Sequence, residues 1–75
     1  MELEIHRTTY QGSQLEEITI IGNHGNYLGL LSIYEDSLLY NRPNGLDMPL
    51  DGTTRREGLQ EIARYLIDSD YAQYI

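Results

Sequence analysis

The side chains that carry most enzyme chemistry are scarce in this chain of 75 residues. Cysteine is absent, and the only histidines are His6 and His24. His6 falls on the exposed side of an expected strand, beside Glu17, where a histidine is more often a charge partner than a general base. His24 falls in a turn, where histidine tolerates a positive φ. Ser, His and Asp lack the spacing of a nucleophile elbow, so we expect no catalytic residues.

Three further segments are weak candidates for ligand binding. Residues 47–52 offer two carboxylates and a glycine but lack the ladder of oxygen ligands that a calcium loop needs. Asp68 and Asp70 are interpreted as ordinary solvent-exposed carboxylates without a ligand. Residues 22–25 contain glycine but open no helix, which argues against a phosphate cradle. We therefore expect no metal and no cofactor, and a small hydrolase is the weakest functional hypothesis.

Negative charge is the clearest compositional signal. Twelve Asp and Glu residues stand against five Arg and no Lys, which gives a net charge of −7. This excess argues against direct binding to nucleic-acid phosphates or to anionic lipid. No apolar run approaches the roughly 18 residues of a membrane helix, and residues 1–7 do not resemble a secretory signal. We expect a cytoplasmic protein without membrane contact.

Tyrosine is the only aromatic residue type, with seven copies. Its ring packs like an apolar group while its hydroxyl needs a polar partner, and tyrosine is enriched at interfaces. We expect Tyr40 and Tyr65 to serve as core aromatics, and about half of the seven to be exposed.

The elements that position these residues follow from hydrophobic periodicity, which is near two in the first half of the chain. The expected strands are 2–10, 14–21, 27–34 and 37–40, with two-residue turns at Gln11-Gly12 and His24-Gly25. The first hairpin sets Ile5 opposite Ile18, Leu3 opposite Ile20 and Arg7 opposite Glu16. The later hairpins set Gly29 opposite Ile20, Leu31 opposite Ile18, Ile33 opposite Glu16, Leu38 opposite Ile33 and Tyr40 opposite Leu31.

The remaining third of the chain contains an ambiguous segment and a helix. Residues 46–52 are either a short edge strand or a tethered loop, because Pro49 argues against a central strand. Thr54 and Glu57 have the spacing of a capping box. The apolar stripe of the helix is formed by Leu59, Ile62, Ala63, Leu66 and Ile67. The helix either continues to the end of the chain or breaks at Ser69-Asp70, which would cap a final turn.

These elements predict an α+β fold in which a four-stranded antiparallel meander packs on one C-terminal helix, with residues 1–75 forming a single domain. The face expected against the helix carries Leu3, Ile5, Ile18, Ile20, Leu31, Ile33, Leu38 and Tyr40. The other face is acidic at one side and apolar at the other. It carries Glu2, Glu4, His6, Glu17 and Thr19 on the first two strands, and Ile21, Leu28, Leu30, Tyr34 and Leu39 toward the rest of the sheet.

Two explanations of the second face remain open. Residues 46–50 or the C-terminal tyrosines could fold over its apolar half. Alternatively, the face is a partner surface, in which apolar anchors are rimmed by acids and tyrosines. The expected contact residues are Glu2, Glu4, Glu17, Glu35 and Asp36 as charges, with Leu28, Leu30 and Tyr34 as anchors.

Rigid carboxylates on strands can imitate a row of phosphates. In size and charge the chain resembles the small acidic inhibitors encoded by phages and mobile elements, which include anti-CRISPR and anti-restriction proteins, some of them DNA mimics. The resemblance implies an inhibitor that blocks a basic, nucleic-acid-binding host protein by steric and electrostatic occlusion. The alternative is a structural homodimer or assembly subunit that pairs through the apolar outer face or an open strand edge.

Overall fold

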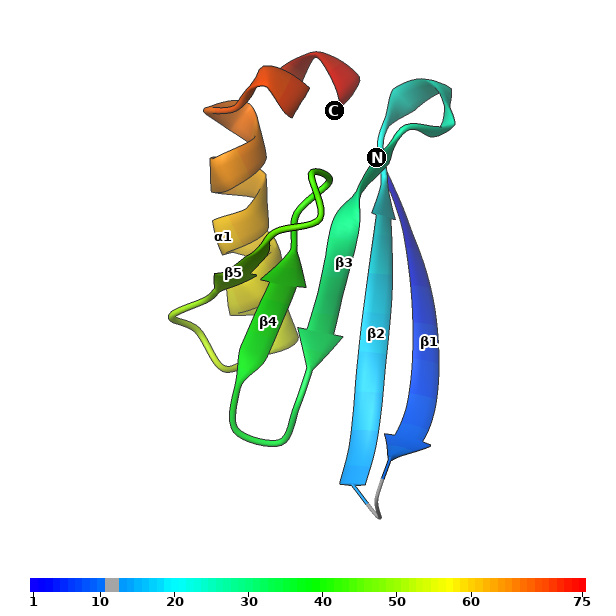
Figure 1. The fold of residues 1–75 in the computed structure, drawn as a ribbon, viewed down its shortest axis with the longest axis vertical. Helices are drawn as coiled ribbons and strands as arrows, with labels where there is room; N and C mark the ends of the chain where they lie inside the picture. Colours follow the sequence, from blue (N-terminus) through cyan, green and yellow to red (C-terminus); the bar gives the residue numbers. More distant parts are fainter. Residues whose placement is uncertain (11–12) are drawn as a thin grey trace.

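The computed structural model describes the backbone of residues 1–10 and 13–75 and the side chains of residues 1–7 and 16–75. Its α+β architecture is a five-stranded antiparallel sheet and one α-helix (Figure 1). The strands follow chain order across the sheet as β1 (Glu2–Tyr10), β2 (Ser13–Ile21), β3 (Tyr27–Ile33), β4 (Leu38–Asn41) and β5 (Asp47–Pro49). The expected turn at Gln11-Gly12 lies outside the described residues.

The fifth strand corrects the four-stranded prediction. Strand β5 pairs with β4 and sets Met48 opposite Tyr40, so the edge-strand interpretation of residues 46–52 is confirmed. Alternation buries part of Met48 and exposes Asp47 and Pro49. Because Pro49 lacks a backbone N–H, it suits a strand that has a neighbour on one side only.

The register of the first hairpin is confirmed, including the pair of Arg7 and Glu16. The second hairpin departs from prediction at Gly29. Thr19 lies opposite Leu30, but Ile21 lies opposite Tyr27, so two residues of β3 stand against one of β2. This arrangement is a β-bulge, and Gly29 provides the positive φ of 115° that it contains.

The bulge changes which side chains reach the core. Leu28 turns to the helix side of the sheet, where it is 0% exposed. The Tyr40 hydroxyl donates a hydrogen bond to the Leu28 carbonyl at 2.6 Å. A Cβ atom at position 29 would collide with the Tyr40 ring, so the glycine serves the packing as well as the backbone.

Helix α1 (Arg55–Ile67) begins where the capping box predicts. The Thr54 hydroxyl accepts from the Glu57 amide at 3.2 Å, and the Glu57 carboxylate accepts from the Thr54 amide at 3.2 Å. Ile62 and Leu66 are buried, whereas Ile67 is exposed. The helix ends before Ser69, which caps a 3₁₀ turn, η2 (Asp70–Tyr74), so the second of the two expected endings is correct.

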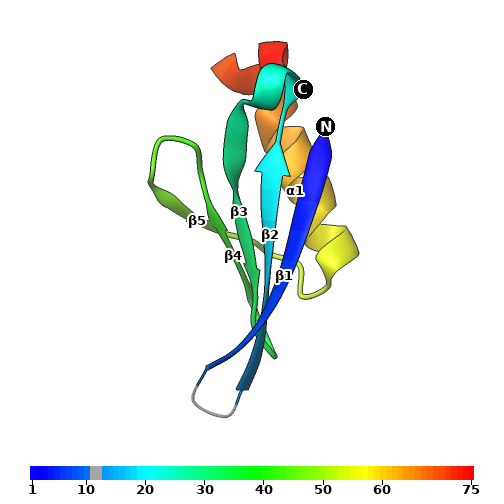
Figure 2. The same cartoon turned by 90° about the vertical axis from the view of Figure 1, so that its right-hand side faces the viewer.

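Helix α1 covers only part of one sheet face, lying behind the sheet in Figure 1 and beside it in Figure 2. Tyr65 packs edge to face against Tyr40 on β4, with ring centroids 5.8 Å apart. The buried core consists of Ile18, Ile20, Leu28, Leu31, Leu38, Tyr40, Ile62 and Leu66. Leu3 and Ile5 are 42% and 48% exposed, so the prediction that they join the core is wrong. They point to the helix side, but the helix lies over the other end of the sheet.

The sheet face turned away from α1 is called the outer face below. Neither segment that was expected to cover it does so. Residues 47–49 join the sheet as β5, while Tyr71 and Tyr74 pack against the buried core. Within the described residues, no helix or strand lies over the outer face (Figure 2).

Candidate functional site

The acidic part of the outer face is assembled by the register of the first two strands. Glu2 lies opposite Ile21, Glu4 opposite Thr19, and His6 opposite Glu17. Because directly opposed residues point to the same side of a sheet, Glu2, Glu4 and Glu17 share one surface, as predicted. Paired strands hold these carboxylates in place, so the spacing of their backbone positions is fixed before any partner arrives.

The apolar part continues from these acids toward β4. Thr19 lies opposite Leu30, and Ser32 lies opposite Leu39. Leu30 and Leu39 are half-buried by their neighbours in the sheet and keep part of their surface exposed. The outer face therefore has an apolar centre beside an acidic margin. Leu30 lies on this face, as expected.

Leu28 is not part of this surface. The β-bulge turns its side chain into the core, which corrects its assignment as an exposed anchor. Tyr27 takes the outer position instead, opposite Ile21, and is exposed. The sequence contained a signal for this exchange, because a glycine inside a strand pattern marks a bulge.

Tyr34, Glu35 and Asp36 lie apart from the acidic margin, in the turn between β3 and β4. The Tyr34 amide donates to the Ser37 carbonyl at 2.9 Å, and the Tyr34 side chain is 45% exposed. Tyr34 and Glu35 line a hollow of about 590 Å³ whose other lining residues include both arginines of a nearby ion-pair cluster. The structure therefore separates these three residues from Glu2, Glu4 and Glu17.

The ion pairs leave the outer face negative. Glu16, on the helix side of β2, pairs with Arg55 and with Arg7, whose Nε lies 3.4 Å from the carboxylate. On the outer face, His6 Nε2 lies 3.9 Å from a Glu4 oxygen. In the described part of the chain, neither Glu2 nor Glu17 pairs with a cation. Their charge is available to a partner.

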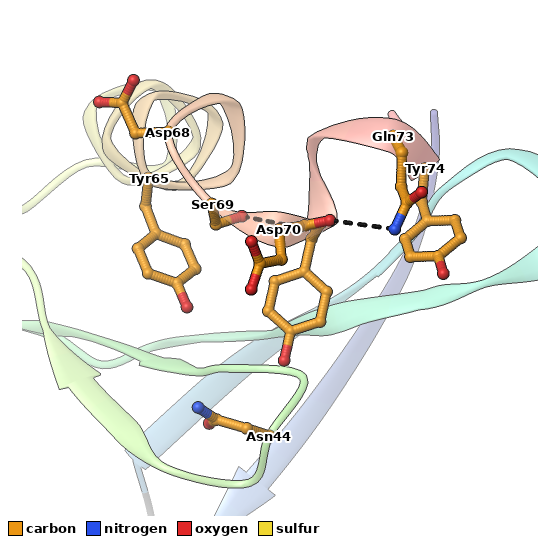
Figure 3. A pocket seen from close by; sticks show the side chains of 8 residues that line it. Asn44, Tyr65, Asp68, Ser69, Asp70, Gln73 and Tyr74 are labelled. Atoms are coloured by element: carbon orange, nitrogen blue, oxygen red, sulfur yellow. Dashed lines mark hydrogen bonds between the residues drawn. The ribbon is translucent and has the colours of Figure 1, made fainter.

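A second hollow, of about 580 Å³, lies where η2 approaches the β4–β5 loop (Figure 3). Its lining combines three tyrosines with two carboxylates and no cationic side chain: Asn44, Tyr65, Asp68, Ser69, Asp70, Tyr71, Gln73 and Tyr74. The Ser69 hydroxyl accepts from the Tyr71 amide at 3.1 Å and donates to the Leu66 carbonyl at 2.8 Å.

The residues considered for catalysis remain apart. His6 is exposed on β1, and His24 adopts a φ of 58° in the 3₁₀ turn η1 (Asn23–Gly25), as its turn position predicts. The expected two-residue loop is wrong, because residues 22–26 separate β2 from β3. Among the described residues, no group of three His, Asp or Glu side chains is placed to hold a metal ion. In the same part of the chain, no helix is long and apolar enough to span a membrane.

The geometry thus brings together four of the expected contact residues, Glu2, Glu4, Glu17 and Leu30, and excludes Leu28. Comparisons with known protein families, curated proteins and solved structures find no match for this chain.

Proposed function

We propose that the chain is a non-enzymatic binding protein whose outer face docks on a cationic partner protein. The observation that supports this is the open outer face, where Glu2, Glu4 and Glu17 stand beside the partly exposed Leu30. An apolar centre beside an acidic margin suits a specific interface, with the apolar part for affinity and the charges for orientation.

The partner class that fits this face is a protein with an Arg- or Lys-lined groove for DNA or RNA. Strand pairing fixes the backbone positions of the carboxylates, so binding need order only their side chains, which favours affinity through preorganisation of the backbone. The net charge of −7 would steer the encounter and make association dependent on salt. Occupying such a groove would exclude the nucleic acid, which is the action of a phage-type inhibitor, and an anti-CRISPR or anti-restriction role belongs to this proposal.

A homodimer through the outer face is the alternative use of the same surface. Its apolar centre, with Leu30 and Leu39, favours self-association. Its acidic margin opposes it, because two copies would bring Glu2, Glu4 and Glu17 together without a compensating cation. We therefore favour a cationic partner over a second copy at this face.

The decisive experiment uses the chain as bait in an extract of its source cells, with mass spectrometry of the captured proteins. Wild type is compared with E2Q/E4Q/E17Q, which removes three outer-face charges, and with D51N/D68N/D70N, which removes three charges elsewhere. We expect the first triple variant to lose a nucleic-acid-binding protein that the second retains. The affinity of the purified pair should fall by at least tenfold between about 0.05 M and 0.5 M salt.

If both triple variants capture the nucleic-acid-binding protein equally well, the outer-face charges do not contribute to its binding. A purified pair whose dissociation constant ignores salt would likewise contradict electrostatic docking. Light scattering of wild type and Leu30→Glu at micromolar concentration tests the alternative, because only an outer-face homodimer would dissociate in that variant.

A further inference from the structure

The two edges of the sheet differ in how well they are protected against pairing with another strand. Edge strand β5 has three residues and ends in Pro49. Edge strand β1 has nine residues and no proline. In the part of the chain that the structure describes, no strand pairs with the free side of β1. Natural sheets blunt their edges with short strands, proline and charged side chains; β5 uses the first two, whereas β1 carries only the charges of Glu2, Glu4 and Arg7.

The free edge also carries uncovered apolar surface on its helix side. Leu3 and Ile5 lie opposite Ile20 and Ile18, both fully buried, so they extend the core layer sideways to the edge. They are 42% and 48% exposed because α1 packs on β3 and β4. A second strand beside β1 would cover part of both side chains while satisfying the free backbone groups.

We propose that β1 pairs in antiparallel fashion with β1 of a second copy of this chain. The choice of a second copy rests on the charges of β1 itself. Its described part, Glu2–Arg7, contains two glutamates, an arginine and a histidine, so it carries groups of both charge signs. In an antiparallel pair of such edges, a glutamate of one copy can lie opposite the histidine of the other.

The register follows from the pleat. Leu3, Ile5 and Arg7 all point to the helix side of β1. The helix sides of the two copies must match, so these three residues can lie opposite only one another across the two-fold axis. An axis at Glu4 sets two glutamates face to face, and an axis at His6 sets two histidines face to face. An axis at Ile5 sets Ile5 opposite Ile5, and Glu4 opposite His6 of the second copy, twice by symmetry. Of these three registers, only this one has an apolar pair on the axis and opposes each Glu4 with a histidine, which attracts it when protonated; Leu3 then lies opposite Arg7 of the second copy.

The pairing would join two sheets into one and place the outer faces of the two copies side by side. Glu2, Glu4 and Glu17 of each copy would then lie on one continuous surface that stays open to solvent, unlike in a dimer that stacks the two outer faces. The inference does not depend on the proposed cationic partner, since β1 pairs through its edge and leaves the outer face open.

The test is the oligomeric state of the full chain, by sedimentation equilibrium between micromolar and millimolar concentration. We expect wild type to dimerise and Ile5→Asp to stay monomeric, with unchanged circular dichroism because Ile5 is half-exposed in the monomer. The matched control is Leu30→Glu on the outer face, which should dimerise like wild type. A monomeric wild type at millimolar concentration would overturn the proposal, as would a dimer lost in Leu30→Glu and kept in Ile5→Asp.

Charge exchange tests the register. Glu4→Lys and His6→Glu should each raise the dissociation constant of their own homodimer about tenfold, because each spoils both symmetric pairs. Mixed in equal amounts, they should form a heterodimer in native mass spectrometry, since Lys at position 4 then faces Glu at position 6. Glu4→Lys mixed with wild type should bind more weakly than wild type alone. Tighter binding in that mixture would place Glu4 opposite itself and refute the register.

Discussion

At the scale of single residues, Tyr40 links the buried core to the β-bulge. Its hydroxyl donates to the Leu28 carbonyl at 2.6 Å inside the core. We expect Tyr40→Phe to lower the free energy of unfolding by about 1–2 kcal/mol, because the carbonyl loses a buried donor. Urea denaturation measures the change. Tyr34→Phe is the control, since the Tyr34 side chain is exposed, and an equal loss in both variants would contradict this role for the hydrogen bond.

The same residue predicts how stability responds to alkaline pH. Burial raises the pKa of Tyr40 well above its ordinary value of 10.0, and the neighbouring Tyr65 adds to the shift. The folded state therefore favours the neutral phenol. The stabilisation is fully present below pH 10 and is lost as pH rises toward the folded-state pKa, because the unfolded chain ionises first. Unfolding free energies between pH 9 and 11 should fall more steeply for wild type than for Tyr40→Phe, and equal slopes would refute the assignment.

Leu28 and Leu30 are two residues apart in the chain and differ completely in what they contact. Leu28→Glu should unfold the protein, because it places a carboxylate in a core whose only polar side-chain group, among the described residues, is the Tyr40 hydroxyl. Leu30→Glu should stay folded, since Leu30 remains partly exposed, and should lose the cationic partner of the proposed function only if that partner uses the apolar centre. Circular dichroism separates the two variants. A folded Leu28→Glu would contradict the placement of Leu28.

At the scale of elements, local rules account for most of what the sequence predicted. The capping box joins residues three apart, and the first hairpin is fixed by alternation, so both could be read directly. The exposure of Leu3 could not, because it depends on where α1 packs. Gly29 was a local signal for a bulge, but the burial of Leu28 depends on how the bulge packs against Tyr40. The same non-local packing decided the candidate site: the acids on β1 and β2 were placed correctly, whereas Leu28 was assigned to the wrong face.

Gly58 sets how closely α1 approaches the sheet. A Cβ atom there would lie 2.8 Å from Leu38 Cδ1 and 3.3 Å from Leu31 Cδ2. Helix propensity alone predicts that Gly58→Ala stabilises the protein by about 1 kcal/mol. We expect net destabilisation of about 1 kcal/mol instead, because overpacking forces the leucines or the helix to move. Chemical denaturation measures it, with the exposed Gln60→Ala as control. A more stable Gly58→Ala would show that the contact relaxes at little cost.

At the scale of the whole molecule, the acidic charge is divided between two environments on the two sides of one strand. Glu16 faces the helix side, where Arg7 and Arg55 both pair with it. Glu17 faces the outer side, where, among the described residues, it makes no ion pair and lies on the surface shared with Glu2 and Glu4. Glu16 thus links β1, β2 and α1 through its ion pairs and has a structural role. Glu17 keeps an uncompensated charge, which suits binding.

This division predicts opposite responses to two neighbouring substitutions with the same change in charge. Glu16→Gln should lower the free energy of unfolding by up to about 1 kcal/mol at low salt, because it removes both ion pairs while the net negative charge becomes smaller. Glu17→Gln should leave stability unchanged or raise it slightly, since it only relieves repulsion on the outer face. Thermal denaturation in about 0.02 M and 0.5 M salt measures both, and screening should bring the two variants together. Equal effects at low salt would mean that net charge, and not the placement of the carboxylates, governs the stability of this fold.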